Sequence, residues 1–171
     1  MPAVSVLIAT YNRAHFLREA IDSVQAQTFQ DWELIVVDDG SSDETPQILA
    51  EYARQDARIR TVRQANRGLA AARNAGIRDA RGAFVAIIDD DDVWLPEKLE
   101  HQAAFMQSHP ELAFSFTLAT MTDAALRPLK TFPELPAGWS ETFPNLVRRN
   151  VVPLPTAMIR RDCLLAVGGF D

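Results

Sequence analysis

The sequence predicts an α/β fold: a doubly wound, mostly parallel sheet with helices on both faces. Continuous apolar runs, such as residues 84–88, are typical of strands that are covered on both sides, as in parallel sheets. These runs alternate with amphipathic helical patterns through short connections, which is the order of a right-handed, Rossmann-like sheet. With 171 residues, of which 47% are hydrophobic and 23% charged, the chain has the size and composition of one globular domain.

The first two strands and the helix between them have clear signals. Residues 4–10 are β-branched and apolar and predict a strand, followed by a turn at 11–13. The next helix, which ends near residue 28, carries Leu17, Ile21 and Val24 on one face. Residues 32–37 predict a second buried strand.

The second and third helices flank a short strand at residues 59–62. The second helix has Pro46 in its first turn, and Ser42 or Asp43 can cap it. The third helix follows residues 66–68, and Gly82 ends it before the strand at 84–88. The inner face of the second helix is predicted to contain Ile48, Leu49, Tyr52 and Ala53, and that of the third Leu69, Ala72, Gly76 and Ala80.

A fourth helical pattern starts at residues 95–96, and the signals weaken after residue 112. A strand is expected within 113–120 and another at 156–159, and a helical turn is expected at 161–167. A proline-containing loop is expected at 130–140. Trp139, Phe143 and Leu146 are expected to form an exposed apolar patch.

Acidic residues directly follow two of the predicted strands. Asp38 and Asp39 follow the strand at 32–37, and four consecutive aspartates, 89–92, follow the strand at 84–88. Open α/β sheets bind ligands at the carboxyl ends of their strands, so we expect these carboxylates to converge on a ligand. A solvated acidic loop is the plain alternative, and the second acidic run in an equivalent place argues against it.

Crowded carboxylates repel one another unless a cation or hydrogen-bond donors offset their charge. Mg²⁺ and Mn²⁺ commonly take one or two carboxylates together with phosphate oxygens, so a metal with a diphosphate is the expected ligand. Tyr11 offers a flat face for a base, and Arg73 offers positive charge near phosphate.

Several other classes are disfavoured. The formal net charge of −6 argues against a nucleic-acid partner. Neither the GxGxxG pattern nor the P-loop pattern is present. His15, His101 and His109 lack metal-ligand spacing and are expected to be structural or surface residues, and the single cysteine, Cys163, allows no internal disulfide. Since the apolar run at 3–9 is too short to span a bilayer, we expect a cytoplasmic protein, with peripheral contact at the inner membrane left open.

Four blocks together resemble the family 2 glycosyltransferases of the GT-A fold, in the family's order and over nearly all of the chain. They read VSVLIATYNR, QTFQDWELIVVDDGSSDET, NRGLAAARNAGIRDARGAFVAIIDDDDVWLPEKL and IRRDCLLAVGGFD. The resemblance implies a nucleotide-sugar donor, usually a UDP-sugar, with Mn²⁺ or Mg²⁺, and inversion at the anomeric carbon. It also implies a saccharide or lipid-linked acceptor.

Individual residues carry over from the resemblance. Tyr11 matches the base-stacking position, Asp39 the acid that binds uracil, with Asp38 in support, and Arg73 a basic position near the nucleotide. The family's DxD motif is placed with Asp91 and Asp89 as metal ligands and with Asp89 or Asp90 facing the ribose. The sugar and acceptor side matches residues 155–156 and 168–171. The full nucleotide-binding set implied is Thr10, Tyr11, Asn12, Arg13, Asp38, Asp39, Arg73, Asp89 and Asp90.

The family's catalytic base usually lies downstream of GGFD, where this chain ends. Asp171 is therefore a weak candidate, and we expect the base to be absent. The chain is predicted to be a single domain over 1–171, truncated at its C-terminus. Its residues 1–110 are expected to bind the nucleotide and 111–171 to start the acceptor side.

Three alternatives remain at this point. A receiver-like Mg²⁺-binding module also collects aspartates at such an edge, but it needs a lysine from a late strand, and only Lys130 lies in that region. A nucleotidyltransferase would need a glycine-rich basic loop in place of residues 11–13. A nucleotide-binding protein without transferase activity is the third.

Overall fold

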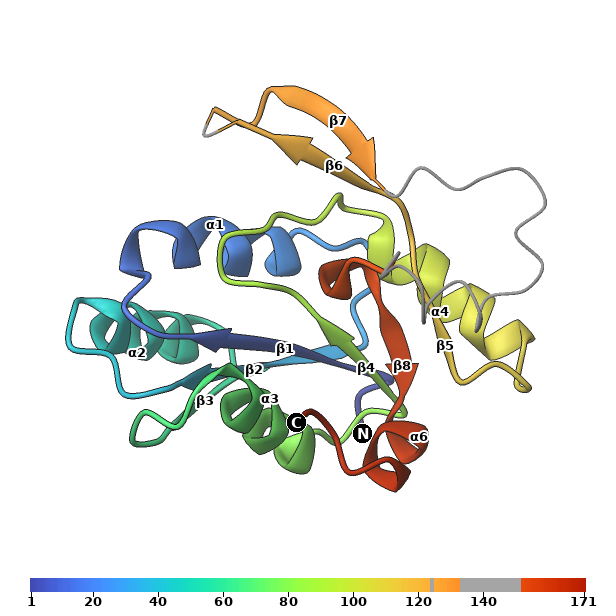
Figure 1. Ribbon diagram of the computed structural model, residues 1–171, viewed down its shortest axis with the longest axis horizontal. Helices are drawn as coiled ribbons and strands as arrows, with labels where there is room; N and C mark the ends of the chain where they lie inside the picture. Colours follow the sequence, from blue (N-terminus) through green and yellow to red (C-terminus); the bar gives the residue numbers. More distant parts are fainter. Residues whose placement is uncertain (124, 133–151) are drawn as a thin grey trace.

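The computed structural model describes residues 1–123, 125–132 and 152–171. Its central sheet has six strands in the order β3-β2-β1-β4-β8-β5 (Figure 1). The first four strands are parallel, β8 is antiparallel to β4, and β5 is antiparallel to β8. The doubly wound, mostly parallel α/β fold is therefore confirmed. The strands are β1 (Val4–Thr10), β2 (Trp32–Asp38), β3 (Ile59–Arg63), β4 (Phe84–Ile87), β5 (Phe114–Ser115) and β8 (Met158–Arg160).

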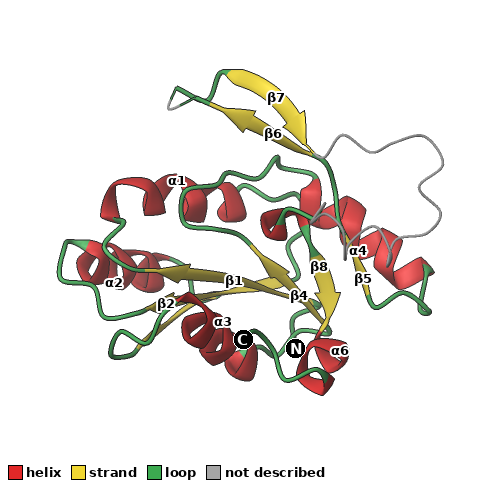
Figure 2. Cartoon of the chain, viewed as in Figure 1, coloured by secondary structure: helices red, strands yellow, loops and turns green. Residues whose placement is uncertain are grey.

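Helices cover both faces of this sheet, as Figure 2 shows. On one face, Val4, Val6 and Ile8 of β1 belong to a core that includes side chains of α1, α2 and α4. On the other face, Leu7 belongs to a second core with side chains of α3 and α6. This alternation follows the two-residue period of a strand. The helices are α1 (Ala14–Gln25), α2 (Thr45–Gln55), α3 (Leu69–Asp79), α4 (Lys98–Ser108) and α6 (Arg161–Ala166).

The strand order reverses between β1 and β4. From β1 the chain moves outward through β2 and β3, and it then returns to place β4 on the other side of β1. Such a switch point leaves a crevice at the carboxyl ends of the two strands, where ligands of open α/β sheets bind. The loops after Thr10 and after Ile88 meet at this point, since Ile88 N–H donates to the carbonyl of Leu7.

The early part of the chain matches the expected elements closely, with small differences at helix ends. The first helix ends at Gln25 rather than near residue 28, and the fourth begins at Lys98 rather than at 95–96. Glu44, not Ser42 or Asp43, occupies the cap position of α2. The carboxylate of Asp43 still accepts a hydrogen bond from Thr45 N–H at 3.0 Å, as a capping side chain does.

Two predictions beyond residue 112 were wrong. The strand expected at 113–120 is two strands in different sheets, because β5 joins the central sheet while β6 (Ala119–Thr122) pairs with β7 (Pro128–Phe132) in a separate hairpin. Residues 130–132 of the expected loop belong to β7. The rest of that loop lies outside the described residues, as do Trp139, Phe143 and Leu146. A 3₁₀ turn, η1 (Leu154–Thr156), precedes β8, which starts at Met158 rather than at residue 156.

Candidate active site

A cleft of about 560 Å³ opens at the carboxyl ends of β1, β2 and β4. It lies at the switch point of the sheet, where the sequence predicts a ligand site. The first loop contributes Tyr11 and Arg13, the second Asp39, and the third the acidic run. The lining residues are Ala9, Thr10, Tyr11, Arg13, Asp39, Asn66, Gly68, Leu69, Ala72, Asp89, Asp90 and Asp91.

The loop after β1 presents the ring of Tyr11, which is 47% exposed. Asn12 turns the chain with a left-handed φ of 54°, a conformation that asparagine adopts more readily than most residues. Its Oδ1 accepts a hydrogen bond from Ser42 N–H at 2.8 Å, and its own N–H donates to Ser41 Oγ at 2.9 Å. These bonds hold the loops after β1 and β2 together and leave the face of Tyr11 available to a ligand.

The loop after β2 is held by its two aspartates. Asp38 is buried, accepts a hydrogen bond from Ser41 N–H at 2.8 Å and lies 3.5 Å from Nε of Arg63. Gly40 follows with a φ of +87°, and a Cβ there would lie 3.0 Å from the backbone nitrogen of Asn66. Glycine therefore meets both demands of this turn, the positive φ and the close approach.

Asp39 joins this turn to the loop before α3. Its carboxylate accepts hydrogen bonds from Gln64 Nε2 at 2.7 Å, from Arg67 N–H at 2.9 Å and from Gly68 N–H at 2.8 Å. A carboxylate has about four acceptor positions, so one remains for a ligand. The same bonds set the position of Asn66, Gly68 and Leu69 in the cleft wall.

The acidic run after β4 is paired with two arginines. Arg73 Nη2 lies 2.6 Å from Asp89 Oδ1, and Arg13 Nη2 lies 2.7 Å from Asp91 Oδ2. Arg13 Nε also lies 3.6 Å from Asp90. These contacts bring the predicted basic and acidic residues together at one edge of the cleft.

Not all of the negative charge in this run is offset. Burial raises the pKa of Asp90, and the charges of Asp91 and Asp89 add to the effect, against the opposing influence of Thr10 and Arg13. Burial and then the carboxylates of Asp89, Asp91 and Asp90 raise the pKa of Asp92 to about 6. A group of acids that resists ionisation is the electrostatic setting that a cation relieves.

The residues present fit a divalent cation. The side chains of Asp91 and Asp89 are 41% and 37% exposed, so both carboxylates are open to the cleft. Mg²⁺ and Mn²⁺ are commonly bound through one or two carboxylates together with phosphate oxygens and water. Within the described ranges, no group of three or more His, Cys, Asp or Glu side chains is arranged as a metal site.

Most of the predicted site residues lie in or beside the cleft. Asn12, Asp38 and Arg73 do not line it, but each binds a residue or loop that does. The matched segments 155–156 and 168–171 do not line it, and the candidate base Asp171 is exposed. His15 and His101 are exposed, as expected of surface residues.

The sequence analysis missed four wall residues and placed a fifth wrongly. Asn66 and Gly68 line the cleft, and the signal for them was their place in the loop just before a helix at the ligand edge. Ala9 and Ala72 provide its apolar floor without a sequence signal of their own. Leu69, which was assigned to the inner face of α3, is 54% exposed and lines the cleft instead.

Residues 5–164 match the description "Glycosyl transferase family 2". The chain belongs to this family. The putative teichuronic acid biosynthesis glycosyltransferase TuaG of Bacillus subtilis is 37% identical over 162 residues, which cover 94% of this chain and 63% of TuaG. The putative glycosyltransferase EpsH of the same organism is 46% identical over 99 residues, which cover 58% of this chain and 29% of EpsH.

Solved structures agree with the GT-A fold expected for the family. Residues 1–349 of TarS from S. aureus, in complex with UDP-GlcNAc, align with a TM-score of 0.77 at 27% identity, over 99% of this chain and 48% of that chain. The mannosyltransferase PcManGT of Pyrobaculum calidifontis, in complex with GDP-Man and Mn²⁺, aligns with a TM-score of 0.74 at 24% identity and supports the fold alone. The chain thus spans about half of these structures and from 29% to 63% of the two curated relatives.

Family membership does not favour the receiver-like alternative. The lysine that such a module needs would be Lys130, which lies in β7 of the separate hairpin rather than at the end of a strand of the central sheet. In the part of the chain that the structure describes, no helix is both long and apolar enough to cross a membrane.

Proposed function

We propose that this chain carries the donor-binding half of a metal-dependent, inverting glycosyltransferase, which moves a sugar from a UDP-sugar to an acceptor hydroxyl. The cleft carries this proposal, because it brings the aromatic face of Tyr11, the acceptor Asp39 and the acids at 89–91 together at one switch point. These are the groups that a base, a ribose and a diphosphate need. TarS, 27% identical over 99% of this chain, was crystallised with UDP-GlcNAc, which supports a uridine donor.

The base is proposed to lie against Tyr11, with an N–H of the pyrimidine donating to the remaining acceptor position of Asp39. Asp38 supports this contact indirectly, because it holds the turn that carries Asp39. Thr10 and Asn12 fix the loop that carries Tyr11.

The diphosphate is proposed to lie between the acids and the two arginines. Asp91 and Asp89 would hold Mn²⁺ or Mg²⁺, and Asp89 or Asp90 would accept hydrogen bonds from the ribose. A bound divalent cation supplies positive charge for the departing nucleoside diphosphate. Arg13 now pairs with Asp91, and we expect its guanidinium to turn to a phosphate oxygen when the donor binds.

In the transfer itself, the acceptor oxygen attacks the anomeric carbon while the bond from that carbon to the diphosphate breaks. A carboxylate takes the proton of the acceptor hydroxyl. We place this base C-terminal to Asp171, with Asp171 as a weaker candidate, because the relatives extend well beyond the matched region. The acceptor is proposed to be a saccharide or a lipid-linked saccharide, reached from the side of residues 155–156 and 168–171.

Thermal unfolding with UDP, GDP, ADP and dTDP, each with and without Mn²⁺, tests this proposal. A ligand at 100 times its dissociation constant adds about 2.7 kcal/mol, which corresponds to a rise of roughly 5–10 °C at this size. We expect the rise with UDP, only when Mn²⁺ is present. Asp91→Ala should abolish it, and the exposed Asp31→Ala should keep it. No rise with any nucleotide would overturn the proposal.

A further inference from the structure

Asn74 clamps the backbone of Phe170 with both polar atoms of its side chain. Phe170 N–H donates to Asn74 Oδ1 at 2.9 Å, and Asn74 Nδ2 donates to the carbonyl of Phe170 at 2.7 Å. Asparagine suits this cyclic contact because its side chain offers one acceptor and one donor group, as the peptide does. The clamp joins α3 to a residue 96 positions later in the chain.

The two glycines before Phe170 make this approach possible. Gly168 and Gly169 both have a φ of +85°, and their N–H groups donate to the carbonyls of Leu165 and Leu164, both at 3.1 Å. This is the hydrogen-bond pattern of a Schellman motif at the end of α6. A Cβ on Gly169 would overlap Oδ1 of Asn74. The glycine pair thus ends the helix and delivers Phe170 to α3 at close range.

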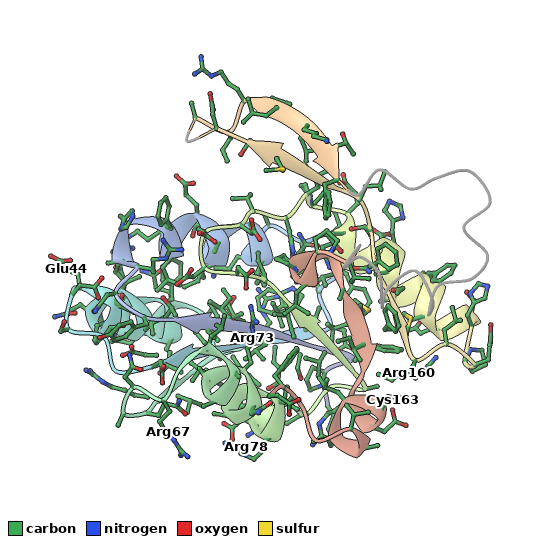
Figure 3. The ribbon with its side chains drawn as sticks, viewed as in Figure 1. Glu44, Arg67, Arg73, Arg78, Arg160 and Cys163 are labelled. Carbon is green, nitrogen blue, oxygen red and sulfur yellow. The ribbon has the colours of Figure 1, made fainter. Side chains whose placement is uncertain are left out.

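The ring of Phe170 lies next to the guanidinium of Arg73. The guanidinium carbon is 5.6 Å from the ring centroid, within the range of a cation–π contact. Only 13% of the Arg73 side chain is exposed, and its Nη2 lies 2.6 Å from Asp89. Figure 3 shows Arg73 over the central strands, whereas the labelled Arg67 and Arg78 extend to the outer surface.

These contacts form a continuous path from α6 to the acidic edge of the cleft. We propose that Asn74 and Phe170 are positioning residues for the donor, which hold Arg73 in the orientation in which it meets Asp89. An arginine side chain has many rotamers, and fixing it in advance removes an entropy cost that ligand binding would otherwise meet. The inference rests on the proposed donor site, since it assigns Asn74 and Phe170 a role in that site.

The test measures UDP affinity in the presence of Mn²⁺ by calorimetry for Asn74→Ala, Phe170→Leu and the double variant. Each single variant is expected to weaken binding about 3- to 10-fold, the range for one side chain that must be ordered on binding. The double variant should be no weaker than the weaker single variant, because residues that act as one unit are not additive. Gln30→Ala is the control, as it removes hydrogen bonds to Gln27 and Arg58 away from the cleft, and it should bind UDP like the wild type.

A second readout needs no ligand. The side-chain Nε–Hε resonance of Arg73 should show a rigid guanidinium in the wild type and in Gln30→Ala, and a mobile one in Asn74→Ala and Phe170→Leu. If the wild type fails to bind UDP, the proposed function fails, and this readout still tests the positioning. Unchanged Arg73 mobility and unchanged UDP affinity would both overturn the inference. Phe170→Leu keeps the backbone clamp, so the test also holds if Asn74→Ala does not fold.

Discussion

Tyr11→Ala separates ligand binding from folding more cleanly than any other substitution in the cleft. The ring is 47% exposed, so about half of its surface is free for a base. A buried aromatic side chain covers roughly 200 Å², and half of that at about 25 cal/mol per Å² gives about 2.5 kcal/mol as an upper limit. Base–aromatic stacking measured by alanine substitution is about 1–3 kcal/mol, which agrees with this figure.

The expected result is therefore a UDP dissociation constant raised about 5- to 100-fold in the presence of Mn²⁺. Tyr11→Phe should keep most of the affinity, because it keeps the ring. Phe105→Ala, which removes a ring of similar exposure (46%) on α4, should change nothing in binding. Urea unfolding should show all three variants within about 1 kcal/mol of the wild type. A change of less than twofold in Tyr11→Ala would refute the stacking role.

Three further predictions concern the acids and the packing of the sheet. Asp91→Ala should abolish the Mn²⁺-dependent part of UDP binding in calorimetry while leaving the far-UV circular dichroism unchanged. Gly76→Ala should lower the free energy of unfolding by about 1–3 kcal/mol, because a Cβ there would overlap the side chain of Leu7; a neutral result in urea unfolding would contradict the packing of α3 on β1. The hydrogen bond from Arg58 lowers the pKa of Asp56 to about 2, so this carboxylate should contribute about 1–2 kcal/mol above pH 4, after a discount for partial exposure. That contribution should disappear as the pH falls through 2, and Asp56→Asn should lose it at pH 7 in the same unfolding assay.

The sequence was sufficient for the sheet and for its ligand edge. A buried parallel strand needs an apolar run, and such runs predicted β1 with both ends correct and β4 to within one residue. The acids at 38–39 and 89–92 could be placed together because the carboxyl ends of parallel strands share one edge. Only the direction and neighbours of β1 and β4 had to be right for this prediction.

Other features depend on distances that a sequence does not contain. Leu69 has the spacing of an inner-face residue, but the first turn of α3 lies at the cleft, where no sheet covers it. The pairing of Arg13 with Asp91 joins residues 78 positions apart, and any of several arginines could have taken that place. Strands β5 and β8, of two and three residues, are too short for a period to be recognised.

A crystal structure of this chain with UDP and Mn²⁺ tests the central claim most directly. We predict the uracil ring against Tyr11 with an N–H at Asp39, the diphosphate beside Arg13, and the cation bound by Asp91 and Asp89. In that complex the contact between Arg13 and Asp91 should be broken. UDP bound outside the cleft, or a cation bound without contact to Asp89 or Asp91, would contradict the account.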